Sequence, residues 1–74
     1  MKIKIRLETN TDALRLFAIA QSMPDENITI TDGNGLRARA CSLLGALSAM
    51  EYEDLWLESE NDHYAAFRGF VADA

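Results

Sequence analysis

The stretch from residue 28 to residue 50 constrains the fold most, because three local patterns follow one another in it without a break. Residues 27–32 alternate between polar and apolar side chains, as expected of a strand with one buried face. Gly33-Asn34-Gly35 supplies the positive-φ residues that a hairpin turn needs, and residues 36–40 alternate again. Ser42 is then placed to cap a helix. The apolar positions of that helix are Leu43, Leu44, Leu47 and Met50.

The rest of the chain predicts two further strands and two further helices. Residues 2–8 alternate, with Ile3, Ile5 and Leu7 on the buried side, and residues 55–58 form the other strand. A first helix begins near the capping types Asn10, Thr11 and Asp12, ends at Pro24, and has apolar positions at Ala13, Leu16, Phe17, Ala20 and Met23. A last helix starts at Asn61-Asp62 and holds Ala66, Phe67, Phe70 and Val71. We expect Phe17 and Phe70 to be core residues.

The order β-α-β-β-α-β-α predicts an α+β fold, an open-faced β-sandwich in one domain spanning residues 1–74. Because the strands alternate, the four-stranded antiparallel sheet has one apolar face, and all three helices must cover it. The opposite, solvated face is expected to display Lys2, Lys4, Arg6, Thr29, Thr31, Arg37, Arg39, Trp56 and Glu58. Trp56 has two interpretations there: local packing under a cation from a neighbouring strand, or an anchor for another protein.

Composition narrows the class of protein. The 49% hydrophobic and 26% charged fractions are typical of a globular domain, and no run approaches the about 18 apolar residues that a membrane span needs. The alternating N-terminus and the single Cys41 favour a cytoplasmic location. A net charge of −5, with one basic residue against seven acidic ones in residues 40–74, argues against nucleic-acid binding.

Several short motifs recur in a fixed order along the chain: I-T-I-T at 28–31, A-C-S-L-L-G at 40–45, Ser48, and Asp62 with Ala66 in the closing helix. Together they resemble the bacterial HPr family, the phosphocarrier proteins of the sugar phosphotransferase system. Phe17 and Ile28 also keep the separation that the family shows between its first helix and second strand. The resemblance covers nearly the whole chain and implies an HPr-like fold with the strand order 1-4-2-3.

This chain differs from the HPr family at the positions that the resemblance assigns to the family's phosphorylation site. The position of the phosphate-accepting histidine falls on Asn10, that of the arginine on Asp12, and that of the proline on Ala13. Asn10 has no basic nitrogen to accept a phosphoryl group, and the carboxylate of Asp12 would repel one. We therefore expect a degenerate site that carries no phosphate.

Ser42 is the candidate regulatory residue. It matches a serine that is phosphorylated by a dedicated kinase in many family members and in a histidine-lacking paralogue, and Leu43, Leu44 and Leu47 match positions that face partner proteins. These four residues also have a purely structural interpretation, because serine is a common N-cap and leucines are common in cores. The resemblance thus implies another protein as partner, either an HPr kinase-like enzyme or a regulator.

No catalytic constellation accompanies these motifs. His63 is expected to be a surface residue near a helix end, Cys41 a packed thiol, and the acidic residues 51, 53, 54, 58, 60 and 62 a solvated face without metal-ligand spacing. We expect no cofactor, no metal and no enzymatic activity, and a monomer or weak homodimer. The sequence predicts an HPr-like, non-carrier regulatory or protein-interaction module; the alternative is a phosphotransferase-system component that carries phosphate at an atypical site.

Overall fold

The computed structural model describes residues 1–23 and 27–72 of the chain. The elements are β1 (Lys2–Ile5), α1 (Asn10–Gln21), β2 (Thr29–Thr31), β3 (Arg37–Arg39), α2 (Leu43–Ser48), β4 (Leu55–Glu58) and α3 (Tyr64–Phe67). Short 3-10 turns, Ala49–Glu51 and Arg68–Phe70, extend α2 and α3. The predicted order of strands and helices is confirmed, whereas the predicted helix end at Pro24 lies outside the described residues.

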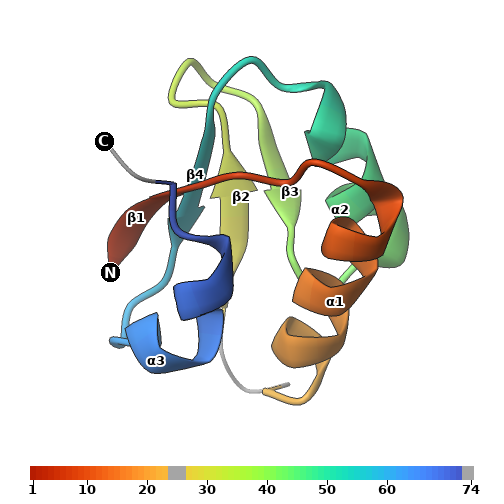
Figure 1. Cartoon of the computed structure of the whole chain (residues 1–74). Coiled ribbons are helices and arrows are strands. Elements are labelled where there is room, and N and C mark those ends of the chain that lie inside the picture. The colour runs from red at the N-terminus through yellow and green to blue at the C-terminus, as the bar shows by residue number, and fades with distance from the viewer. Residues whose placement is uncertain (24–26, 73–74) are drawn as a thin grey trace.

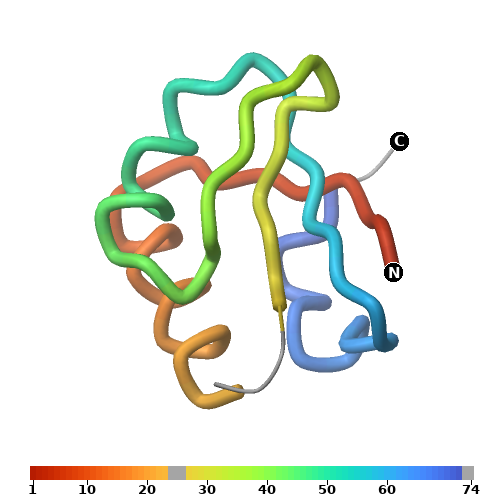
Figure 2. Tube along the Cα trace, turned by 180° about the vertical axis from the view of Figure 1, so that it is seen from behind, coloured from red at the N-terminus to blue at the C-terminus, as the bar shows by residue number. Residues whose placement is uncertain are grey.

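The four strands form one antiparallel sheet in the order β1-β4-β2-β3, so β4 lies between β1 and β2 although it is last in the sequence. The three helices lie in front of this sheet in Figure 1, and the strands lie in front when the molecule is seen from behind in Figure 2. The predicted α+β class with an antiparallel open sheet and three helices is therefore confirmed. Among the described residues, no helix is long and apolar enough to cross a bilayer.

The core lies between the helices and the apolar face of the sheet. Leu57 of β4 faces Ile3 of β1 and Ile30 of β2 in the register, and its side chain is fully buried. The buried hydrophobic residues are Ile5, Leu7, Ala13, Leu16, Ala20, Ile28, Ile30, Ala40, Ala46, Ala49, Leu55, Leu57, Phe67 and Phe70. The alternation in the sequence thus assigns the inward residues of β1, β2 and β4 correctly.

Phe17 and Leu36 are less buried than the sequence predicts. The buried stripe of α1 runs through Ala13, Leu16 and Ala20, which leaves Phe17 half-buried at the margin of the core. Leu36 is 55% exposed because β3 begins one residue later, at Arg37, and Leu36 belongs to the turn. The prediction that Phe17 is a core residue is wrong, and the one for Phe70 is confirmed.

The N-caps of α1 and α3 each lie one residue away from the positions that the sequence predicts. Thr9 is the N-cap of α1, where its Oγ1 accepts a hydrogen bond from the Asp12 amide at 3.2 Å, while Asp12 Oδ2 accepts one from the Thr9 amide at 3.3 Å. This reciprocal pair is a capping box. The N-cap of α3 is His63, and the Asp62 carboxylate accepts a bond from the Tyr64 amide at 2.9 Å.

The C-terminal segment lies along β1 and is not helical at Val71, contrary to the prediction. Val71 pairs with Ile5 in an isolated antiparallel bridge. The Arg6 amide donates to the Phe70 carbonyl at 2.8 Å, and the Ala72 amide donates to the Lys4 carbonyl at 2.9 Å. Because an uncovered edge strand exposes unpaired backbone groups, this segment protects the β1 edge of the sheet.

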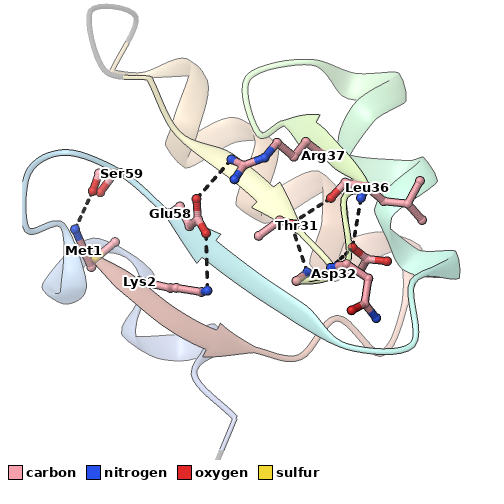
Figure 3. Close-up of polar contacts among 10 residues, drawn as sticks. Met1, Lys2, Thr31, Asp32, Leu36, Arg37, Glu58 and Ser59 are labelled. Atoms are coloured by element: carbon pink, nitrogen blue, oxygen red, sulfur yellow. Dashed lines mark hydrogen bonds and ion pairs between the residues drawn. The ribbon is translucent and has the colours of Figure 1, made fainter.

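The β2–β3 turn is held by side chains as well as by glycine geometry. Gly33 and Gly35 have φ values of +82° and +112°, as the sequence predicts. Thr31 Oγ1 donates to the Leu36 carbonyl at 2.8 Å and accepts from the Gly33 amide at 3.1 Å (Figure 3). Thr31 is only 2% exposed, so its predicted place among the solvated residues is wrong. Its hydroxyl is a buried structural group of the turn.

Thr31→Val should lower the free energy of unfolding by about 1–3 kcal/mol, because the change keeps the shape of the buried side chain but removes the hydroxyl that bonds two backbone groups of the turn. Thr29→Val, at the half-buried neighbouring position on the same face, is the matched control and should change it by less than about 0.5 kcal/mol. Urea denaturation of both variants measures the difference. Equal effects would contradict the role of the Thr31 hydroxyl.

Phe67→Ala should lower the free energy of unfolding by about 3–5 kcal/mol, since the ring of Phe67 is fully buried in the core. Phe17→Ala should cost clearly less, because the Phe17 ring is already partly in contact with solvent. Thermal unfolding followed by circular dichroism separates the two variants. A larger loss for Phe17→Ala than for Phe67→Ala would contradict the packing described above.

Candidate functional site

The start of α1 holds a carboxylate where the resemblance implies a phosphate-binding site. Asp12 Oδ2 accepts hydrogen bonds from the backbone amides of Glu8 and Thr9, at 3.0 and 3.3 Å. Helix N-termini attract anions, and here the chain supplies its own anion. Asn10 is exposed in the first turn of the helix. The Asp12 carboxylate therefore has a structural role at the helix start. Its negative charge would repel an added phosphoryl group.

Ser42 caps α2, as the sequence predicts. Its Oγ accepts a hydrogen bond from the Gly45 amide at 3.2 Å, and its backbone is extended, with φ −106° and ψ 125°. The side chain is exposed. The hydroxyl is thus both a cap and a surface group at the point where β3 leads into α2.

The leucine surface, which we define as Leu43, Leu44 and Leu47, begins directly after this cap. Leu44 is 77% exposed and Leu43 is 42% exposed. Leu47 is half-buried and packs against the core. Two of the three leucines predicted to face a partner are therefore largely outside the core, and the third connects them to it.

A further exposed leucine, Leu14, is not among the residues predicted from the sequence. It lies on α1, which packs beside α2 in both views of the molecule (Figures 1 and 2). On a helical projection Leu14 falls outside the buried stripe of Ala13, Leu16 and Ala20, and this offset could have identified it. The helical side of the molecule thus carries exposed leucines on two neighbouring helices.

Gly45 determines how closely α2 approaches β3. A Cβ atom at this position would lie 2.8 Å from the Arg39 carbonyl oxygen and 3.4 Å from the Cβ of Ala38. The nearer of these atoms is backbone, so it cannot move aside as a flexible side chain would. The absence of a side chain at Gly45 therefore allows the first turn of α2, with Ser42 and Leu44, to lie against the edge strand.

On the far side of the sheet, Trp56 and Glu58 project from β4 between the other strands. The Lys2 and Lys4 ammonium nitrogens lie 5.3 and 5.9 Å from the centre of the Trp56 ring, which is the contact expected under the packing interpretation of Trp56. Glu58 forms ion pairs with Lys2 at 3.7 Å and with Arg37 at 3.2 Å (Figure 3). Beside these pairs lies a hollow of about 450 Å³. It is lined by Met1, Lys2, Asn27, Thr29, Arg37, Glu58, Ser59 and Glu60.

The remaining candidate groups are dispersed. His63 is half-buried, and its backbone amide donates to the Met1 sulfur at 3.3 Å. Cys41 is half-buried and packs against the core. The Asp54 carboxylate pairs with Lys4 of β1, whereas the Asp62 carboxylate accepts a hydrogen bond from the Tyr64 amide at the start of α3. Within residues 1–23 and 27–72, no three His, Cys, Asp or Glu side chains are grouped so that they could hold a metal ion.

No protein-family model, no curated protein and no solved structure matches this chain. The leucine surface belongs to α2, in the layer of helices, whereas Trp56 belongs to β4 of the sheet. The helices cover one face of that sheet (Figures 1 and 2).

Gly45→Ala should lower the free energy of unfolding by about 1–3 kcal/mol, because the new methyl group overlaps the Arg39 carbonyl, even though alanine is the better helix former. Gly69→Ala is the matched control, since a Cβ atom there would have no neighbour within 4 Å and the φ of Gly69 is not positive. It should leave stability unchanged or raise it slightly. Urea denaturation measures the free energy of unfolding of both variants. An unchanged value for Gly45→Ala would contradict the close contact.

Proposed function

We propose that this chain is an HPr-like protein-interaction module that does not carry a phosphoryl group and that docks a partner through the leucine surface. The observation that carries the proposal is the exposure of Leu44, which is 77% exposed on a helix end fixed by a serine cap and a glycine contact. Exposed aliphatic side chains held on a rigid element are typical of protein-binding sites.

The resemblance to the HPr family supports the same proposal. The strand order β1-β4-β2-β3 agrees with the order that the resemblance implies. Asp12, at the position of the family's arginine, places a negative charge at the start of α1, which disfavours phosphotransfer there. We accordingly propose a regulatory role related to the sugar phosphotransferase system, and a cytoplasmic location.

Ser42 is the proposed switch of this module. Its hydroxyl is exposed and immediately precedes Leu43 and Leu44, so a phosphate there would add about 1.5 to 2 negative charges beside the leucine surface. Such a charge would change the affinity for a partner without requiring α2 to unfold, because the group sits at the helix N-terminus. In the alternative function, the chain carries a transferable phosphate at an atypical site.

Incubation with ATP and an HPr serine kinase should add one phosphate to the chain, measured by intact-mass spectrometry. Ser42→Ala should abolish the gain in mass, and Ser48→Ala, which changes the other exposed serine of α2, should not. Leu44→Ala should slow phosphorylation about tenfold by weakening the contact with the kinase. The exposed Leu36, in the β2–β3 turn, gives the matched control Leu36→Ala, which should retain the wild-type rate.

Failure of the kinase to modify the chain, or retention of the phosphate in Ser42→Ala, would contradict the switch. Equal rates for Leu44→Ala and Leu36→Ala would contradict docking through the leucine surface. Circular dichroism of each variant establishes that it is folded, and both leucines are exposed, so neither change removes a core contact.

A further inference from the structure

The uncovered face of the sheet carries a regular array of side chains. The strand register aligns the outward-facing residues in two rows across the four strands. One row is Lys2, Glu58, Thr29 and Arg39, and the other is Lys4, Trp56, Thr31 and Arg37. We name these eight residues the outer face. All four cations lie on the edge strands β1 and β3, and the central strands hold the aromatic ring, the threonines and a single carboxylate.

The charge of the outer face is opposite to that of the chain as a whole. Its eight residues comprise four cations and one carboxylate, whereas the complete chain has a net charge of −5. Lys2, Lys4 and Arg37 form ion pairs, but their side chains are about half exposed or more. Exposed ion pairs contribute little free energy. These cations can therefore exchange their present partners for carboxylates of another molecule at small cost.

Trp56 is held in a fixed position at the centre of this array. The Lys2 and Lys4 ammonium groups lie over its ring, and a Cβ atom at Gly33 would lie 3.7 Å from two atoms of the indole. The ring is therefore confined between the β1 lysines and the β2–β3 turn. A large side chain that already has neighbours on two sides loses less conformational entropy on binding than a free one, and tryptophan is frequent at the centres of protein interfaces.

We propose that the outer face binds an acidic, extended segment of a partner protein. The carboxylates of the segment would replace Asp54 and Glu58 as partners of Lys4 and Arg37 and would reach Arg39, while an apolar side chain would lie against Trp56. The hollow of about 450 Å³, whose lining includes Lys2, Arg37 and Glu58 as well as Glu60, offers space where the segment crosses β4.

Two other occupants fit less well. A second copy stacked face to face would oppose cations with cations, which is unfavourable. A nucleic-acid strand would place a charge on every nucleotide next to Glu58 and Asp54, on a chain that is already negative overall. An acidic peptide can form ion pairs with the cations and carries fewer negative charges than a nucleic-acid strand of the same length. The proposal is independent of the leucine surface, which lies on the helical side.

Trp56 is the single tryptophan of the chain, so its fluorescence reports directly on the outer face. The full chain is titrated with a synthetic peptide of alternating glutamate and valine, with a matched lysine and valine peptide, and with single-stranded oligothymidylate. The glutamate peptide should change the fluorescence saturably and should bind more weakly as salt is raised. Arg39→Gln and Lys4→Gln should each raise the dissociation constant about threefold.

Two variants serve as controls. Arg68→Gln removes an exposed cation in the turn after α3, and Leu44→Ala alters the leucine surface; both should bind the glutamate peptide like the wild type. The proposal is overturned by the absence of a fluorescence change, by equal binding of the lysine peptide, by tighter binding of the oligothymidylate at the same salt, or by wild-type affinity in both Arg39→Gln and Lys4→Gln. A loss of binding in Leu44→Ala would also overturn it, because the outer face would then not be the site.

Discussion

The pairing of β4 with both β1 and β2 is the constraint on which the rest of the molecule depends. Leu57 faces apolar residues of both neighbouring strands and is fully buried, so the core is continuous across strands that are far apart in the sequence. The same strand turns Trp56 and Glu58 to the other side, where each contacts a lysine of β1. One four-residue strand thus determines both the centre of the core and the centre of the outer face.

The helical side depends on a second close approach. Gly45 allows the first turn of α2 to contact β3, and the Ser42 cap fixes the direction of that turn. Leu44 is 77% exposed, while Ala46 and Ala49, farther along the same segment, are fully buried. The packing that stabilises the domain therefore also produces an exposed apolar surface, and the domain has two surfaces of different chemistry, one on α2 and one on the sheet.

Local patterns in the sequence predict the strands, the hairpin turn and the serine cap, because alternation, positive-φ glycines and capping chemistry each involve only a few neighbouring residues. Burial that depends on register cannot be predicted in this way. Thr31 is covered because β4 places Trp56 beside it and the turn folds over its hydroxyl, whereas Phe17 lies at the margin because the α1 stripe is centred on Leu16. Thr9 is not predicted as a cap, although its partner Asp12, three residues later, gives a capping-box pattern.

Whether the start of α1 accepts a phosphoryl group is the most direct test of the proposed non-carrier function. The decisive measurement is the intact mass of the chain after incubation with phosphoenolpyruvate and enzyme I of the phosphotransferase system. With Asn10 in place of a basic side chain and the Asp12 carboxylate bound to the amides of Glu8 and Thr9, we expect no gain in mass. A gain equal to one phosphate group would contradict the non-carrier function and would favour a carrier with an atypical site.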